Sequence, residues 1–223
     1  MEILAEVHAK WKLEKLKKEI DLLSEFDGYD IPDAALGEPS VIPSVVGTLI
    51  RERLGNKRII LNQRLVDVNE LFVRSLSITS RMMNFDVAFT QGDKPKFGHE
   101  VNQLSSQRAI EIAKSYNVRA GGMISLRKSK DEIFSRLDLP ADFFLGLHFS
   151  GVKSILNLPL DKIIPYVIIR TDKNKEILKG ISQPYFETEE VKLIIDQLAG
   201  LNVKSVLISV PGDVEYLSKI VRK

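Results

Sequence analysis

The chain has 223 residues, with 32 basic and 30 acidic side chains and a formal net charge of +2. This near balance gives no general attraction to nucleic acid or to an anionic membrane, so we expect neither as a partner. The absence of cysteine excludes disulfides, thiolate metal sites and a cysteine nucleophile. The three histidines lack metal-binding spacing, so we expect no metal. Without a signal peptide or a membrane-spanning apolar run, we expect a cytoplasmic protein.

Short apolar runs alternate with longer amphipathic segments along the whole chain. The predicted strands cover 2–7, 28–31, 58–63, 85–90, 118–125, 142–149, 163–170 and 205–210. The predicted helices cover 9–25, 41–54, 67–83, 99–116, 128–138, 150–157, 174–180 with 187–200, and 212–222. Strands that alternate with helices indicate a parallel sheet. The pattern predicts a single-domain α/β fold, a (β/α)8 TIM barrel over 1–223, because a doubly wound sheet would need a glycine-rich first turn.

Acidic residues lie at or just after the ends of three of the predicted strands. In a barrel of this kind, the residues that follow each strand meet at one face, where ligand sites form. Glu6, Asp33 and Asp93 would therefore converge there. Such acids repel one another unless a ligand, a cation or an arginine such as Arg64 or Arg170 neutralises them. The pattern predicts a site, although each acid alone is also typical of a turn or a helix cap.

Two further residues have both a structural and a functional interpretation. Glu6 lies in "ILAEV", where one face should be apolar. It is either a solvent-facing or cation-paired glutamate, or a general acid with a raised pKa in a partly dry pocket. His148 lies between apolar neighbours, as a core histidine or a ligand-binding one would. Asp67, with Glu70 three residues later, predicts the cap of the third helix.

The segment 61–98, "LNQRLVDVNELFVRSLSITSRMMNFDVAFTQGDKPKFG", resembles the central block of the methylenetetrahydrofolate reductase family. Asp67 and Asn69 match the Asp-x-Asn of that family, and "GDKP" at 92–95 matches its Gly-Asp-x-Pro. The first strand resembles the one that carries the family's catalytic glutamate, here at Glu6. The segments "YDIPDAALG" and "RLDLPADFFLGLHF" resemble its second and sixth strand regions.

The family is a flavin-dependent barrel that passes a hydride from a reduced nicotinamide through FAD to the methylene carbon of a folate. The resemblance implies FAD, with NAD(P)H or another electron donor, and a small-molecule pterin substrate. Glu6 would protonate the pterin, and Asp93 would hydrogen-bond both the flavin ring and the pterin. The resemblance implies cofactor contacts from Asn62, Gln91, Gly92, Asp93 and Arg136, and substrate contacts from Asp33 and His148.

Several positions depart from the family pattern. In place of the family's Glu-Phe-x-Pro-Pro this chain has "EVHAK", and in place of its flavin-facing histidine it has Asn62. Gln91 replaces the family's arginine or threonine before Gly-Asp, Arg136 replaces its lysine, and Leu147 replaces its folate-contacting glutamine. Leu147 cannot hydrogen-bond a pterin edge. Two functions in one-carbon metabolism therefore stay open. One is a flavin-dependent oxidoreductase that converts 5,10-methylenetetrahydrofolate or a modified methylene-pterin to the methyl form. The other is a catalytically degenerate pterin- or flavin-binding relative.

Neither interpretation determines the oligomeric state. A homo-oligomer stays open, as does, for the degenerate relative, a subunit of a one-carbon complex. A third interpretation is an unrelated barrel enzyme that shares only the Gly-Asp-x-Pro turn.

Overall fold

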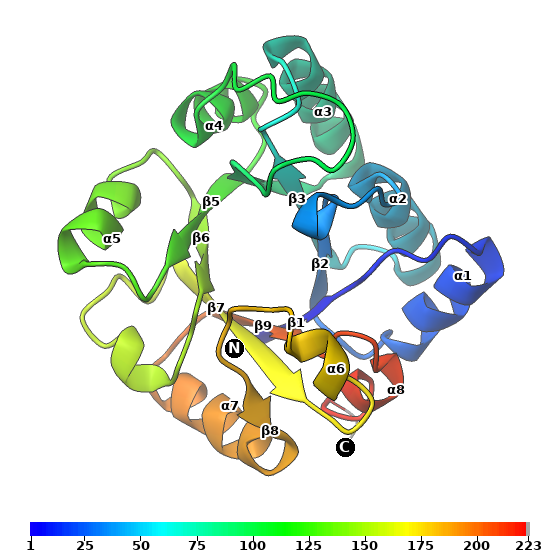
Figure 1. Cartoon of the computed structure of the whole chain (residues 1–223), viewed down its shortest axis with the longest axis vertical. Helices are drawn as coiled ribbons and strands as arrows, with labels where there is room; N and C mark the ends of the chain where they lie inside the picture. Colours follow the sequence, from blue (N-terminus) through cyan, green and yellow to red (C-terminus); the bar gives the residue numbers. More distant parts are fainter. Residues whose placement is uncertain (222–223) are drawn as a thin grey trace.

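Parallel strand pairing closes the sheet into a barrel. The computed structural model of the protein describes residues 1–221 (Figure 1). The barrel strands are β1 (Glu2–Glu6), β2 (Gly28–Pro32), β3 (Arg58–Arg64), β4 (Asp86–Thr90), β5 (Ala120–Ser125), β6 (Phe143–Leu147), β7 (Ile163–Arg170) and β9 (Ser205–Ser209). They are ordered β6-β5-β4-β3-β2-β1-β9-β7, and pairing of β6 with β7 closes the ring. The predicted TIM barrel is confirmed.

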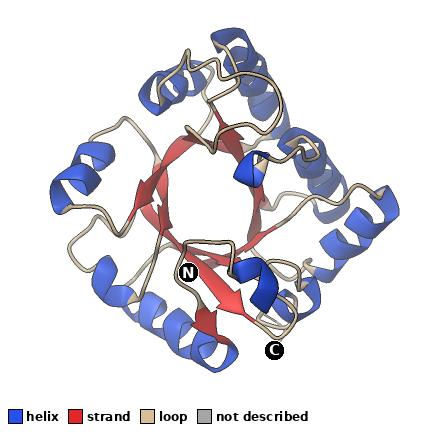
Figure 2. Ribbon diagram, viewed as in Figure 1, coloured by secondary structure: helices blue, strands red, loops and turns tan. Residues whose placement is uncertain are grey.

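Helices surround the ring of strands, as Figure 2 shows. They are α1 (Leu13–Leu22), α2 (Pro43–Leu54), α3 (Glu70–Met83), α4 (Ser106–Ser115), α5 (Lys130–Leu137), α6 (Lys175–Leu178), α7 (Val191–Gly200) and α8 (Val214–Leu217). The helix predicted at 150–157 is only a 3₁₀ turn, Val152–Ser154. Gly151 and Pro159 leave too few residues between them for a stable α-helix. The predicted helix 99–116 begins late because the Ser105 side chain caps it, accepting from Arg108 N at 3.2 Å.

Side chains on each strand point alternately into the barrel and toward the helices. Leu4, Ile60 and Leu207 belong to the apolar cluster inside the barrel. Their sequence neighbours, such as Ala5 and Ile59, belong to the larger cluster beneath the helices. By this alternation Glu6, Asp30 and Asn62 lie on the interior face, near the C-terminal ends of their strands.

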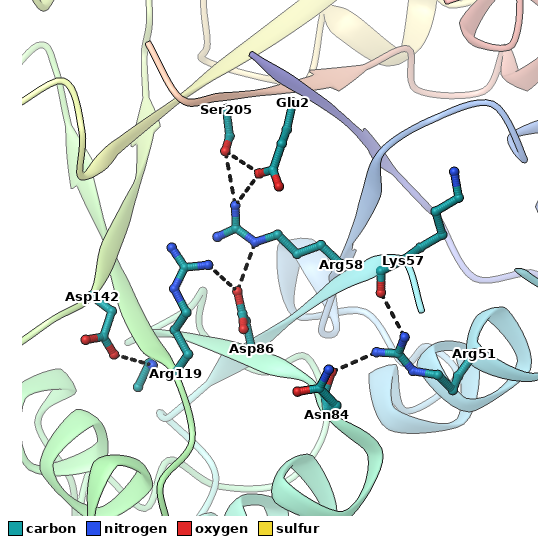
Figure 3. A network of polar contacts seen from close by, with 10 residues as sticks. Glu2, Arg51, Lys57, Arg58, Asn84, Asp86, Arg119, Asp142 and Ser205 are labelled. Atoms are coloured by element: carbon teal, nitrogen blue, oxygen red, sulfur yellow. Dashed lines mark hydrogen bonds and ion pairs between the residues drawn. The ribbon is translucent and has the colours of Figure 1, made fainter. Parts of the chain in front are cut away.

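An ion network closes the N-terminal end of the barrel (Figure 3). Arg58 Nε lies 2.9 Å from Asp86, and Arg58 Nη1 lies 2.9 Å from Glu2. Arg119 pairs with the same Asp86 at 3.0 Å. The two guanidinium groups lie 5.3 and 5.2 Å from the ring centre of Phe143. We call Glu2, Arg58, Asp86 and Arg119 the basal network.

The last residues of β7 leave the barrel. Tyr166, Val167 and Ile168 pair with β9, whereas Ile169 and Arg170 pair with the short outer strand β8 (Phe186–Glu187). The Arg170 guanidinium is bound to Glu187, with Nε and Oε2 3.1 Å apart. Arg170 is therefore not free to neutralise acids at the barrel mouth, the end formed by the C-terminal ends of the strands.

No helix within residues 1–221 is both long enough and apolar enough to span a membrane.

Candidate functional site

Glu6 is the last residue of β1 and points into the barrel near its mouth. It is only 8% exposed. The Tyr166 hydroxyl donates to Glu6 Oε2 at 2.8 Å, and the Ser209 hydroxyl donates to the same oxygen. His8 Nε2 lies 3.0 Å from this oxygen and forms an ion pair with it when protonated. Three groups from β7, β9 and the loop after β1 therefore hold one carboxylate oxygen.

These contacts decide the charge of Glu6. Burial acts to raise the pKa of Glu6, but the charge of His8 and the hydrogen bonds from Ser209 and Tyr166 outweigh it and bring that pKa below its ordinary value. Burial acts to lower the pKa of His8, and the charge of Glu6 overcomes this and raises it. Glu6 is thus a carboxylate in the resting protein, which is opposite to the raised pKa expected of a general acid.

Asp30 is the Cα partner of Glu6 on the neighbouring strand β2. It is fully buried, and neither of its carboxyl oxygens has a hydrogen-bond partner among the described residues. The buried Oδ1 of Asn62 on β3 also lacks one. Burial, and then the charge of Glu6, raise the pKa of Asp30 well above its ordinary value, against smaller opposing effects of Asn62 and Arg58. These surroundings favour the neutral form of Asp30, whereas those of Glu6 favour the carboxylate.

Asp30 is not among the residues predicted from the sequence, although a signal for it was present. Like Glu6, Asp30 is a carboxylate inside an otherwise apolar strand. Asp33 was predicted because it comes after the strand, where ligand sites form in a barrel.

Arg64 joins the loops that follow β2 and β4. The Arg64 side chain is 4% exposed, and its Nη1 donates to Ala34 O at 2.9 Å. Arg64 Nη2 donates to the backbone oxygen of Asp93 at 2.7 Å. The Asp93 carboxylate accepts from Leu36 N at 3.0 Å. We call residues 33–40 and 91–98 the two-loop cap. In this structure the Gly-Asp turn holds the two loops together.

The residues that precede Asp93 serve the same packing. Gly92 has φ 81°, and a Cβ there would lie 2.8 Å from Arg64 Cβ, so a larger residue would displace the arginine. Gln91 donates to Asn102 Oδ1 at 2.9 Å. Both predicted cofactor residues thus have structural contacts.

Asp33 lies at the base of the two-loop cap. Its Oδ2 accepts from Gln63 Nε2 at 2.7 Å and from Arg64 N at 3.4 Å. Burial, which outweighs these contacts, raises the pKa of Asp33 to about 6.

Asp67 does not cap α3, contrary to the sequence prediction. It pairs with Arg64 Nε at 3.1 Å, and the cap is Asn69, whose side chain accepts from Phe72 N at 3.0 Å. β3 ends at Arg64 and α3 begins at Glu70, so Asp67 still lies in the turn between them and Asn69 is the residue next to the helix.

His148 and Arg136 belong to the β5–β6 side of the barrel. His148 Nδ1 lies 2.9 Å from the Ser125 hydroxyl, and His148 N donates to Gln183 at 2.9 Å. Burial, together with the charge of Arg127, lowers the pKa of His148, which favours a neutral imidazole. Arg136 donates to Met123 O at 3.2 Å.

The predicted site residues therefore fall into three groups. Glu6 and Asn62 lie in the interior, with Asp30. Asp33, Gly92 and Asp93 belong to the two-loop cap, and Gln91 adjoins it. Arg136 and His148 contact groups on the β5–β6 side.

Two cavities lie near the C-terminal ends of β1, β7 and β9. The smaller, about 80 Å³, is lined by Glu6, His8 and Glu19 among others. The larger, about 400 Å³, lies beyond the ends of β7 and β9. Its basic residues are paired with carboxylates, as in Lys175 with Asp172 at 2.6 Å. Neither cavity is lined by Asn62 or any other predicted flavin residue.

The residues fit a flavin only in part. Asn62 offers a buried amide oxygen without a partner, which suits a ring N–H. Gln91 and Arg136 already have hydrogen-bond partners, and the Asp93 carboxylate is held by Leu36 N.

Comparisons with known proteins support the fold. No family model matches the sequence, and no curated protein matches it. A Clostridium thermocellum protein that binds two copies of 5-methyl-5,6,7,8-tetrahydrofolic acid is similar in structure, with TM-score 0.69, 15% identity, and coverage of 98% of this chain and 93% of that one.

Two further structures share the fold at lower identity. For the EDTA monooxygenase of Chelativorans sp. BNC1 the TM-score is 0.67 and the identity 8%, covering 99% of this chain and 92% of that one. For a mutant tryptophan synthase alpha-subunit of Pyrococcus furiosus the TM-score is 0.62 and the identity 11%, covering 99% of this chain and 96% of that one. At these identities the likeness shows a TIM barrel and leaves the family as a resemblance.

Proposed function

We propose that this barrel binds a reduced one-carbon pterin at its mouth and acts as a divergent, flavin-dependent reductase of a methylene-pterin to the methyl form. The observation that carries the proposal is Glu6, a buried carboxylate at the end of β1, where the methylenetetrahydrofolate reductase family keeps its acid. The methyltetrahydrofolate-binding neighbour supports the pterin as ligand class. A bound FAD would supply the hydride, with Asn62 as the residue best suited to hold its ring.

The chain's own residues would hold the ligand and supply the proton. Tyr166, Ser209 and His8 fix the orientation of Glu6, so its carboxylate presents a defined oxygen to a ligand. The neutral His148 can accept or donate one hydrogen bond without adding charge. Leu147, the last residue of β6, is apolar where the family has an amide, which favours a modified pterin over folate.

A second function, pterin binding without reduction, is favoured by a specific observation. Gln91, Asp93 and Arg136 have structural partners and so offer FAD little. The absorbance spectrum of the purified protein separates the two functions. Flavin bands support the reductase. Their absence, together with calorimetric binding of a 5-methyl-pterin, favours a binding protein, and neither flavin nor pterin binding would contradict both.

A Glu6→Gln variant tests the reductase directly. Reduction of bound flavin by a nicotinamide donor needs no proton from Glu6, so that half-reaction should stay nearly intact. Re-oxidation by a methylene-pterin should fall by roughly 10²–10⁴-fold, the usual contribution of an acid–base group. Stopped-flow spectroscopy of each half-reaction measures both, with folate and modified pterins as oxidants. Equal re-oxidation rates in the variant and wild type would show that Glu6 is structural.

A further inference from the structure

Asp30 lies in surroundings that disfavour a charge. An ionised carboxylate that is fully buried and has no hydrogen bond is far more costly than a neutral acid. Four groups exert an influence on it: Glu6 from β1, Asn62 and Arg58 from β3, and Tyr166 from β7. Glu6 is an anion, and Asn62 and Tyr166 are neutral. Arg58 is already bound to Glu2 and Asp86 in the basal network.

Glu6 has the opposite surroundings. Hydroxyl groups of Tyr166 and Ser209 donate to it, and His8 adds a positive charge. His8 in turn is influenced by Lys10 and Glu19 as well as Glu6. Neighbouring carboxyl groups with such different surroundings ionise separately, so the pair holds one proton. No group of three or more acidic or histidine side chains within residues 1–221 could hold a metal ion in its place.

We propose that Asp30 holds the single proton of this pair in the resting protein, so that the Glu6 carboxylate lies beside a neutral acid on the neighbouring strand. Asp30 acts through Glu6 and touches no ligand itself. The location of the proton does not rest on the proposed function.

Infrared spectroscopy locates the proton. At about pH 8, two units above the pKa of about 6 for Asp33, ordinary carboxyl groups are ionised and a protonated carboxyl band is diagnostic. We expect this band in wild type, its loss in Asp30→Asn, and its retention in Glu6→Gln. A band lost in Glu6→Gln but kept in Asp30→Asn would place the proton on Glu6 and overturn the proposal. So would the absence of the band in wild type, which decides the matter even if Asp30→Asn does not fold.

The His8 pKa, measured by NMR titration, gives a second readout. Because Asn replaces a neutral acid, Asp30→Asn should leave the His8 pKa unchanged within about 0.3 units, whereas loss of a nearby negative charge would lower it. A lowered pKa would show that Asp30 is ionised and would overturn the proposal. Glu6→Gln is the positive control, because it removes the charge that raises the His8 pKa.

Discussion

Charged and polar side chains have different surroundings at the two ends of the barrel interior. At the N-terminal end, the basal network pairs Arg58 with Glu2 and Asp86, and Arg119 with Asp86, and every charge has an opposite charge beside it although Arg58 Nη2 itself has no hydrogen-bond partner among the described residues (Figure 3). At the mouth, Asp30 is buried without a hydrogen bond, and Asn62 Oδ1 has no partner among the described residues.

This difference indicates that the N-terminal end contributes to stability, whereas the mouth contributes to function. A network whose opposite charges meet within hydrogen-bond distance offsets the cost of burying them. A buried acid without partners lowers stability, and such groups are typical of functional sites. The sharper inference about function therefore comes from the end of the barrel that is less well satisfied.

Breaking the basal network should give the largest loss of stability. Arg58→Met keeps much of the side-chain volume but leaves Glu2 and Asp86 without this cation. Removing one partner of a buried pair costs about 3–5 kcal/mol, and we expect the lower end because Glu2 is half-exposed. The matched control is Arg53→Met, which breaks the exposed pair with Asp21 and should cost at most about 1 kcal/mol. Urea unfolding measures both, and equal losses would contradict a stabilising role of the basal network.

Asp30→Asn should raise the free energy of unfolding, unlike Arg58→Met, which lowers it. A raised folded-state pKa contributes stability below the unfolded value of 3.8, and this is lost as the pH rises toward the folded-state pKa. Asparagine does not titrate, so the variant should gain on wild type by about 1.4 kcal/mol per pH unit through that window. Urea unfolding at several pH values measures the gain.

Because the pKa of Glu6 is lowered, its effect on the pH dependence of stability is opposite to that of Asp30. Its contribution is present above the unfolded pKa and is lost as the pH falls, so Glu6→Gln should be the less stable protein at neutral pH. For Asp30→Asn, a free energy of unfolding that did not rise relative to wild type with increasing pH would show that the Asp30 carboxyl has a hydrogen-bond or ion-pair partner.

Asp33 should give a smaller effect of the same kind. Its pKa rises from 3.8 to about 6, so its contribution is complete below about pH 3.8 and is lost by about pH 6. This difference corresponds to at most about 3 kcal/mol, and Asp33→Asn should remove that part of the pH dependence. NMR titration of the carboxyl group checks the value, and an unshifted Asp33 would leave Asp30 as the main source of the slope.

Periodicity was sufficient to predict the barrel, because alternation along a strand and the length of each helix are local properties. The same alternation predicted that Glu6 lies in an unusual place. It missed Asp30, which lies inside the predicted strand 28–31, because the search for site residues was directed at positions that follow a strand, such as Asp33. The role of the Gly-Asp turn could not be predicted, because Asp93 bonds Leu36, which is 57 residues away, and this depends on how two loops pack.

The smallest effect should come from a residue at the mouth that serves the fold alone. Asn69 caps α3 through Phe72 N at 3.0 Å, so Asn69→Ala should cost about 1 kcal/mol. Asp67→Ala removes a partly exposed pair with Arg64 and should cost no more than that. Neither change touches Glu6, Asp30 or Asn62, so both variants should keep the wild-type infrared band. Urea unfolding and infrared spectra on the same samples measure this. Loss of the band in Asn69→Ala would show that the proton depends on the packing of the whole mouth, and the division between a paired base and an unpaired site would then be too simple.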